Sequence, residues 1–219
     1  MTLAIFDLDN TLIAGDSDHS WGEFLVEKKL VDGEQFQRDN DRFYEDYCKG
    51  QLDIHAYLRF ALKPLSRYSE DELKQLHNEF TQEKILPLWL PKAEALVEKH
   101  RQQGDQLLVI TATNDFITRP IVERFGIEQL LASEGEIING RYTGEAKGIP
   151  SYAEGKVERL KQWLSTQEQQ HDLDEAYFYS DSRNDLPLLE KVGNPIAVDP
   201  DAFLADTAEA KGWPIISLR

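Results

Sequence analysis

Residues 3–11 read LAIFDLDNT, an apolar run that ends in two closely spaced carboxylates. Leu3–Phe6 has the unbroken hydrophobic character of a parallel strand that is buried on both faces. Alternation beyond the strand puts Asp7 and Asp9 on the same side, where two carboxylates repel each other unless a cation or a shared proton separates them. This pair suits a nucleophile beside a general acid/base. The plainer alternative is a loop with acidic caps.

The next part of the chain, from about residue 17 to residue 86, has helical periodicity. A capping box at residues 69–72, with sequence SEDE, opens one of its helices. Aromatic residues recur at helical spacing here, and such residues more often form a core than a cofactor site. The segment therefore predicts a small helical bundle, inserted directly after the first strand, that would lie over a site at the strand ends as a lid.

From residue 87 onward, helices and strands are expected to alternate. We expect helices at Lys92–Gln103, Asp115–Phe125, Gly155–Thr166, Asn184–Val192 and Pro200–Lys211, and strands at Gln106–Ile110, Ala176–Ser180, Pro195–Val198 and Trp213–Leu218. Asn139-Gly140 predicts a hairpin turn. The fold class is therefore predicted to be α/β, a doubly wound Rossmann-like parallel sheet with an inserted all-helical cap. The predicted domains are an α/β core of residues 1–14 and 87–219 and a cap of residues 15–86.

The composition limits the classes of partner. The chain has 219 residues, of which 41% are hydrophobic, so a folded core is expected. Its formal net charge of −16 disfavours nucleic acid and anionic membranes as partners. The same charge repels phosphate esters at long range, so a phosphate site would need its own local positive charge.

Cysteine content and the N-terminal sequence suggest a compartment. Cys48 is the only cysteine, which rules out an intramolecular disulfide and suits a reducing environment. The first residues have neither a basic start nor a long apolar stretch, so we expect neither a signal peptide nor a membrane span. A cytoplasmic location is the resulting expectation.

Three further segments carry polar groups behind apolar strands or at a helix start. Thr111 follows the strand Gln106–Ile110, Lys156 opens a helix, and residues 181–185 read DSRND after another strand. A hydroxyl and a lysine can bind phosphate oxygens, and carboxylates suit Mg²⁺. Taken singly, each has a plainer interpretation: a turn threonine, a surface lysine, and a helix cap supplied by Asp181 or Asn184.

In combination and in this order, the four segments resemble the haloacid dehalogenase superfamily of phosphohydrolases. The chain is similar to subfamily IB, the phosphoserine-phosphatase-like branch, whose helical cap lies between the first and second motifs. Residues 15–21, GDSDHSW, look like a bacterial subgroup that includes histidinol-phosphate phosphatases. The resemblance implies a Mg²⁺-dependent phosphatase that forms an aspartyl-phosphate and acts on a small-molecule phosphate ester.

The resemblance also implies a role for individual residues. Asp7 would be the nucleophile and a Mg²⁺ ligand. Asp9 would be the general acid/base, with its backbone carbonyl on the metal, and Asp181 would be a further ligand. The remaining roles are phosphate binding by Thr111, Ala112 and Lys156, and support of the metal loop by Asn184 and Asp185.

The chain departs from phosphoserine phosphatases at two motifs. Residues 111–114 read TATN where those enzymes have Ser-Gly-Gly, and residues 181–185 read DSRND where they have Asp-Gly-x-Asn-Asp. The chemistry survives both changes, but phosphoserine becomes a less expected substrate.

Substrate choice is expected to lie in the predicted cap. Asp16 falls nine positions after Asp7, where phosphoserine-type enzymes place an acid that binds the substrate amine, and Asp18 adds a second carboxylate. An amine-bearing ester, histidinol phosphate or phosphoserine-like, is therefore the preferred class. Helix capping is an equal alternative for both aspartates. Arg59 is a candidate for a substrate carboxylate, with a surface role as its alternative.

Two other functions remain open from the sequence. One is a phosphotransferase or mutase that passes the phosphoryl group to a sugar phosphate, and the other is a non-catalytic phosphate-binding module. The chain is expected to be a monomer or a homodimer.

Overall fold

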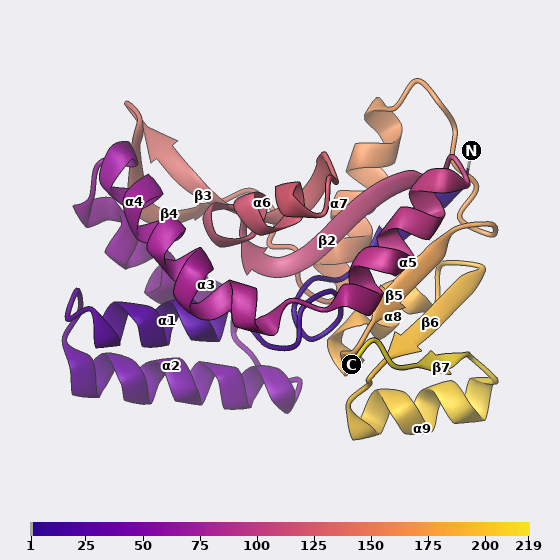
Figure 1. Ribbon diagram of the computed structural model, residues 1–219, viewed down its shortest axis with the longest axis horizontal. Coiled ribbons are helices and arrows are strands. Elements are labelled where there is room, and N and C mark those ends of the chain that lie inside the picture. Colours follow the sequence, from indigo (N-terminus) through magenta and orange to yellow (C-terminus); the bar gives the residue numbers. More distant parts are fainter. Residues whose placement is uncertain (1) are drawn as a thin grey trace.

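The computed structural model describes residues 2–219 and is built on a seven-stranded sheet (Figure 1). The strand order is β4-β3-β2-β1-β5-β6-β7, and every pair is parallel except the antiparallel pair of β3 and β4. The strands are β1 Leu3–Phe6, β2 Gln106–Asn114, β3 Gln129–Ile138, β4 Arg141–Lys147, β5 Tyr177–Ser180, β6 Asn194–Val198 and β7 Ile215–Ile216.

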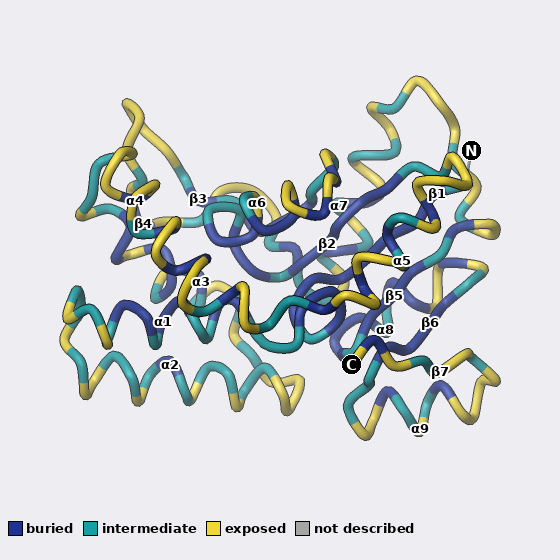
Figure 2. The backbone as a smooth tube through the Cα atoms, in the orientation of Figure 1, coloured by how far each residue is buried: buried dark blue, intermediate teal, exposed yellow. Residues whose placement is uncertain are grey.

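Helices cover both faces of this sheet, as expected for a doubly wound fold. Alternate residues of β1 enter opposite cores: Ala4 and Phe6 pack with α5 and α6, whereas Leu3 and Ile5 pack with α7, α8 and α9. The central strands are mostly buried, while α2 and α9 keep exposed faces (Figure 2). These helices are α5 Pro91–Gln102, α6 Asp115–Arg124, α7 Glu154–Thr166, α8 Leu186–Leu189 and α9 Ala202–Lys211. The predicted α/β fold class is confirmed.

Four helices occupy the chain between β1 and α5 and lie together in space (Figure 1). Trp21 is buried and contacts the rings of Phe24, Phe80 and Phe116, with centroid separations between 5.1 and 5.4 Å. Since Phe116 belongs to α6, this aromatic cluster joins the helical segment to a helix that packs on the sheet. The helices are α1 Ser17–Glu27, α2 Gly33–Cys48, α3 Ile54–Leu62 and α4 Glu70–Phe80, with irregular helical turns at Lys63–Arg67, Thr81–Ile85 and Leu86–Leu88.

Two predicted local motifs are confirmed. Ser69 caps α4, and Glu72 accepts a hydrogen bond from the backbone N–H of Ser69 in return. Asn139 and Gly140 join β3 to β4 with φ values of 52° and 76°. Both positive angles belong to the tight hairpin turn that Asn-Gly favours.

Three element boundaries were predicted wrongly. The strand β2 continues past Ile110 to Asn114 and pairs again with β3 at Ser133. The helix expected at Asn184–Val192 is a short turn followed by Leu186–Leu189. The last strand comprises only Ile215–Ile216, because only these residues pair with β6. None of the helices in the described range, residues 2–219, has both the length and the apolar character needed to cross a membrane.

Candidate active site

Asp7 lies at the carboxyl end of β1, the central strand of the sheet. Its backbone N–H donates to the carbonyl of Tyr179 in β5 at 2.9 Å, so the residue continues the strand pairing. Phe6 aligns with Val109 of β2 on one side and with Tyr179 on the other. Asp7 therefore lies at the carboxyl ends of β1 and β5, and β2 passes alongside it.

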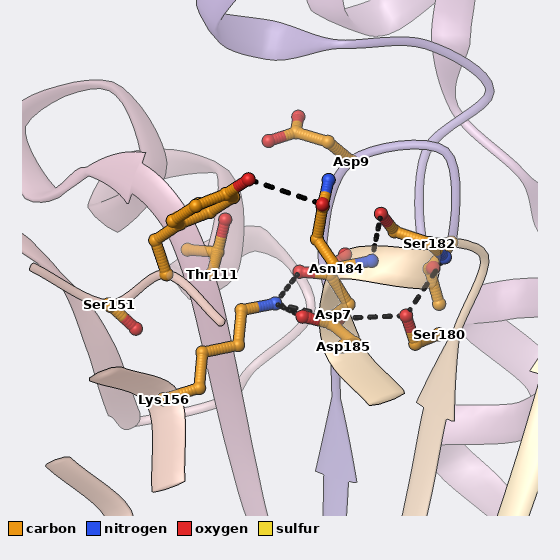
Figure 3. A network of polar contacts seen from close by, with 12 residues as sticks. Asp7, Asp9, Thr111, Ser151, Lys156, Ser180, Ser182, Asn184 and Asp185 are labelled. Carbon is orange, nitrogen blue, oxygen red and sulfur yellow. Dashed lines mark hydrogen bonds and ion pairs between the residues drawn. The ribbon is translucent and has the colours of Figure 1, made fainter. Parts of the chain in front are cut away.

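Lys156 contacts both Asp7 and Asp185 (Figure 3). Its Nζ lies 3.1 Å from Oδ1 of Asp7 and 2.7 Å from Oδ1 of Asp185, and the side chain is only 1% exposed. Burial acts to lower the pKa of Lys156, but the carboxylates of Asp185 and Asp7 together raise it above its ordinary value. Lys156 is therefore a charged group of the site. The alternative interpretation, that it is a surface lysine, is wrong.

The chain places Lys156 by means of a tight turn before α7. Ala153 has φ 48° and ψ −122°, a conformation that L-residues rarely adopt. A Cβ on Gly155 would come within 2.1 Å of the carbonyl oxygen of Pro150, so only glycine fits there. The two residues turn the chain sharply and direct the first turn of α7 toward Asp7.

The carboxylates around Asp7 outnumber the cations. Burial raises the pKa of Asp7 to about 7; Lys156 opposes this rise, whereas Asp185 and Asp9 add to it. Burial also raises the pKa of Asp181 well above its usual range, and Asp7 and Asp185 add to this effect. Both shifts indicate that the cluster needs more positive charge than one lysine supplies.

A hard divalent cation such as Mg²⁺ fits this donor set, because it would neutralise the surplus charge and prefers oxygen ligands. Within residues 2–219, no group of three or more His, Cys, Asp or Glu side chains is arranged to hold a metal. The set expected from the sequence uses two carboxylates, those of Asp7 and Asp181, and the backbone carbonyl of Asp9, so it does not require such a group.

Both carboxylate oxygens of Asp9 accept short hydrogen bonds. Oδ1 accepts from the backbone N–H of Ser17 at 2.7 Å, and Oδ2 accepts from Oγ1 of Thr113 at 2.7 Å. Burial, followed by the nearby Asp16 carboxylate, raises the pKa of Asp9 to about 7. The group is thus held in one orientation and can exist in either protonation state near neutral pH.

A hydrogen-bond network orders the loop after β5 (Figure 3). Ser180 Oγ donates to Oδ2 of Asp185 at 2.7 Å and accepts from the backbone N–H of Ser182 at 3.1 Å. Asp181 Oδ1 accepts from Oγ1 of Thr11 at 3.0 Å. The loop that carries the predicted metal-binding aspartate is therefore tied to the loop that follows β1.

Asn184 links the same loop to the helical segment. Its Nδ2 donates to the backbone carbonyl of Tyr47 at the end of α2 at 3.0 Å, and its Oδ1 accepts from the hydroxyl of Tyr152 at 3.2 Å. Asn184 therefore connects the end of α2 to the loop that follows β5.

Thr111 and Ala112 lie in β2 beside this cluster. The hydroxyl of Thr111 is buried and accepts a hydrogen bond from the backbone N–H of Thr113 at 3.3 Å. The carbonyl of Ala112 accepts from Oγ of Ser133 at 2.8 Å, which fixes the strand where it passes the site.

One pocket contains both aspartate pairs named from the sequence, Asp7 with Asp9 and Asp16 with Asp18. Oδ1 of Asp16 accepts from the backbone N–H of His19 at 2.7 Å, so this residue does cap α1. Arg59 is exposed on α3 and does not line the pocket. The other lining residues are His19, Asn40, Phe43, Tyr44, Tyr47, Leu52, Ile54, Tyr57, Thr111, Ala112 and Thr113.

Several of these residues were not identified as site residues from the sequence. Phe43, Tyr44 and Tyr47 were expected in the core of a helical bundle, but they are half-buried and line the pocket. Thr113 was noted only as part of residues 111–114, where the chain departs from phosphoserine phosphatases. Its spacing of two from Thr111 on a strand that continues is the signal that could have placed it on the same face.

The chain is similar to known hydrolases over most of its length. A family model described as haloacid dehalogenase-like hydrolase matches residues 4–190. A histidinol-phosphatase of Neisseria meningitidis is 49% identical over 99% of both chains. Phosphoserine phosphatase SerB1 of Mycobacterium tuberculosis is 32% identical over 99% of this chain and 70% of that protein.

Solved structures give a consistent result for the fold. A crystal structure of a protein of unknown function from Bordetella pertussis matches with a TM-score of 0.92 and 41% identity over the whole of both chains. A substrate-bound phosphoserine phosphatase matches with a TM-score of 0.73 over 100% of this chain and 93% of that one. At 17% identity, the second likeness concerns the fold alone.

Proposed function

The chain belongs to the haloacid dehalogenase-like hydrolase family and is a phosphatase, and we propose that it hydrolyses a small amine-bearing phosphate monoester through an aspartyl-phosphate on Asp7. The observation that carries this proposal is the single pocket in which Asp7 and Asp9 face Asp16 and Asp18. Asp7 and Asp9 are proposed to react with the phosphate group. Asp16 and Asp18 offer negative charge to a cationic leaving group.

Asp7 is the proposed nucleophile. Its carboxylate oxygen forms a bond to phosphorus while the bond from phosphorus to the ester oxygen breaks. Lys156, 3.1 Å away, lowers the repulsion between this carboxylate and the approaching phosphate. Thr111 and Ala112 border the same space and are proposed to bind the phosphoryl oxygens.

Asp9 is the proposed general acid/base. It gives a proton to the departing alkoxide and then takes one from the water whose oxygen displaces Asp7 from phosphorus. The hydrogen bonds from Ser17 and Thr113 support this role, because they hold the carboxyl group in one orientation.

Asp7, Asp181 and the backbone carbonyl of Asp9 are the proposed ligands of Mg²⁺, with Asp185 and Asn184 supporting their loop. When bound, the ion would supply positive charge that offsets the phosphate and the clustered carboxylates. The surplus of buried carboxylates described above supports this assignment.

We further propose that residues 15–86 act as a cap domain over a core of residues 1–14 and 87–219. Pocket residues from α1, α2 and α3 face Asp7 and support this division. The amine-bearing substrate class is supported by the 49% identical relative that is named a histidinol-phosphatase. The cytoplasmic location and the oligomeric state stay predictions.

The proposal is tested by Mg²⁺-dependent phosphate release from histidinol phosphate, phosphoserine, phosphoethanolamine, glycerol phosphate and sugar phosphates. We expect amine-bearing esters to be preferred and Asp7→Asn to abolish turnover. Asp46→Asn, a change near the end of α2 outside the pocket, is the control. Turnover of sugar phosphates only when a sugar acceptor is present would favour a phosphotransferase, and no turnover of any ester would favour a binding module.

A further inference from the structure

Asp18 is a buried carboxylate with no hydrogen-bond partner for one of its oxygens. The residue is only 6% exposed, and Oδ2 has no partner among the described residues. It lines the same pocket as Asp7 and Asp9. Asp16 differs, because it is more exposed and one of its oxygens caps α1. The capping alternative therefore accounts for Asp16 but leaves Asp18 unexplained.

The described part of the pocket offers Asp18 no fixed cation. No lysine or arginine lines it. His19 is the one basic residue in the pocket lining, and its Nε2 lies 2.9 Å from Oδ1 of Asp41. Lys156 is held between Asp7 and Asp185. Burial, followed by the neighbouring Asp16 carboxylate, raises the pKa of Asp18 well above its usual range. A side-chain hydrogen bond with Tyr57 acts to lower this pKa but does not offset the rise. A buried carboxylate oxygen without a partner, as Oδ2 is, is unfavourable, and a cationic ligand would relieve it.

We infer that Asp18 determines specificity by binding a cationic nitrogen of the leaving group and by rejecting leaving groups that carry a carboxylate. This inference rests on the proposed phosphatase function and narrows its substrate class. The pocket has two carboxylates at this end and no guanidinium or ammonium group to bind a substrate carboxylate. An amino-alcohol phosphate without a carboxylate is thus favoured over an amino-acid phosphate.

The pocket walls favour an organic cation over a small inorganic one. Phe43, Tyr57, Leu52 and Ile54 line the same space as Asp18. Aromatic faces attract cationic nitrogen groups, and the aliphatic residues suit the carbon skeleton that carries them. A leaving group with a protonated nitrogen and an unsaturated or apolar body matches both features.

The test compares kcat and KM for histidinol phosphate, phosphoserine and glycerol phosphate in three proteins: the wild type, Asp18→Asn and Asp32→Asn. Asp32 is an exposed aspartate at the start of α2 whose side chain makes no capping bond, so its change is the matched control. For Asp18→Asn we expect kcat/KM for histidinol phosphate to fall about tenfold or more relative to glycerol phosphate, mainly through KM. The ratio of kcat/KM for histidinol phosphate to that for phosphoserine should also decrease. Asp32→Asn should keep the wild-type ratios.

Equal losses for all three esters in Asp18→Asn would overturn the inference, because they would indicate a structural role. Unchanged ratios would overturn it as well. A second measurement does not depend on turnover: free histidinol should raise the Tm of the wild type but not of Asp18→Asn, whereas inorganic phosphate should raise both. If the wild type hydrolyses no ester at all, the proposed function fails; if it hydrolyses esters without preferring cationic ones, only the role of Asp18 fails.

Discussion

Nζ of Lys156 lies 3.1 Å from Oδ1 of Asp7, although 149 positions separate the two residues in the chain. The lysine also contacts Asp185, so one buried cation serves two carboxylates. Breaking a buried ion pair leaves an uncompensated charge, and this is costlier than losing a surface pair. Lys156 is therefore expected to matter for both stability and chemistry.

Lys156→Met tests this arrangement. We expect the free energy of unfolding to fall by about 3 kcal/mol or more and kcat to fall by about a hundredfold. Denaturant titration and phosphate release measure the two effects. Lys161→Met changes an exposed lysine of the same helix and should leave both quantities close to wild type. A Lys156→Met protein with wild-type kcat would rule out a role for this lysine in the reaction.

Thr113→Val removes the hydrogen bond to Oδ2 of Asp9 and keeps the side-chain shape. We expect kcat to fall about tenfold, because a hydrogen bond to a charged group contributes roughly 1.5–3 kcal/mol. Thr143→Val, on the exposed side of β4, is the control. An unchanged kcat would mean that the backbone N–H of Ser17 alone is enough to orient Asp9.

Asn184→Ala removes the hydrogen bond that Nδ2 of Asn184 donates to the backbone carbonyl of Tyr47. We expect faster amide hydrogen exchange at Gly50 and Gln51, whose N–H groups form the last turn of α2. Tyr47→Phe retains the carbonyl and should leave this exchange unchanged. If Asn184→Ala exchanges like the wild type, the bond does not hold the end of α2.

His77 gives a pH dependence of stability. Its Nε2 lies 2.8 Å from the carbonyl oxygen of Ile117 in α6, and burial lowers its pKa below the ordinary 6.5. The unfolded chain therefore binds a proton more readily, so the stability that neutral His77 provides is present above about pH 6.5 and is lost as the pH falls toward the lowered pKa.

We expect the advantage in unfolding free energy of the wild type over His77→Gln to shrink as the pH falls from about 8 to about 5. His55→Gln, an exposed change on α3, should give a difference that hardly depends on pH. An advantage of His77 that stays constant over this range would contradict the pKa shift. Denaturant titrations at several pH values provide the comparison.

Local sequence patterns predicted the parts of the fold that depend on neighbouring residues. The capping box at Ser69 and the Asn139-Gly140 turn each form because of interactions within a few positions. The apolar run Leu3–Phe6 was predictable from its composition, although its strand partners lie more than a hundred positions away. The end of β2 was missed, because the polar string TATN resembles a loop while pairing with β3 extends the strand. Pairing between strands is a tertiary effect that propensity does not encode.

The charged residues of the site could be predicted from the sequence, but the residues that contact them could not. Asp7, Lys156, Asp181 and Asp185 follow strands or open a helix, and parallel topology brings them to one edge of the sheet. The contact of Thr113 with Asp9 crosses 104 positions and leaves no local pattern. The aromatic side chains of α2 have the spacing of a core helix, and only the packing of α2 decides which of them line the pocket.

The most direct test of the proposed mechanism is to identify the residue that carries the phosphoryl group during turnover. The preferred ester from the panel is mixed with Asp9→Asn protein, in which hydrolysis of the intermediate should be slowed, and the reaction is quenched in acid for peptide mass spectrometry. We expect one phosphoryl group on the peptide that contains Asp7, and none when Asp7→Asn is added to the same protein. A phosphoryl group on another residue, or steady phosphate release from Asp7→Asn, would contradict the assignment of Asp7 as the nucleophile.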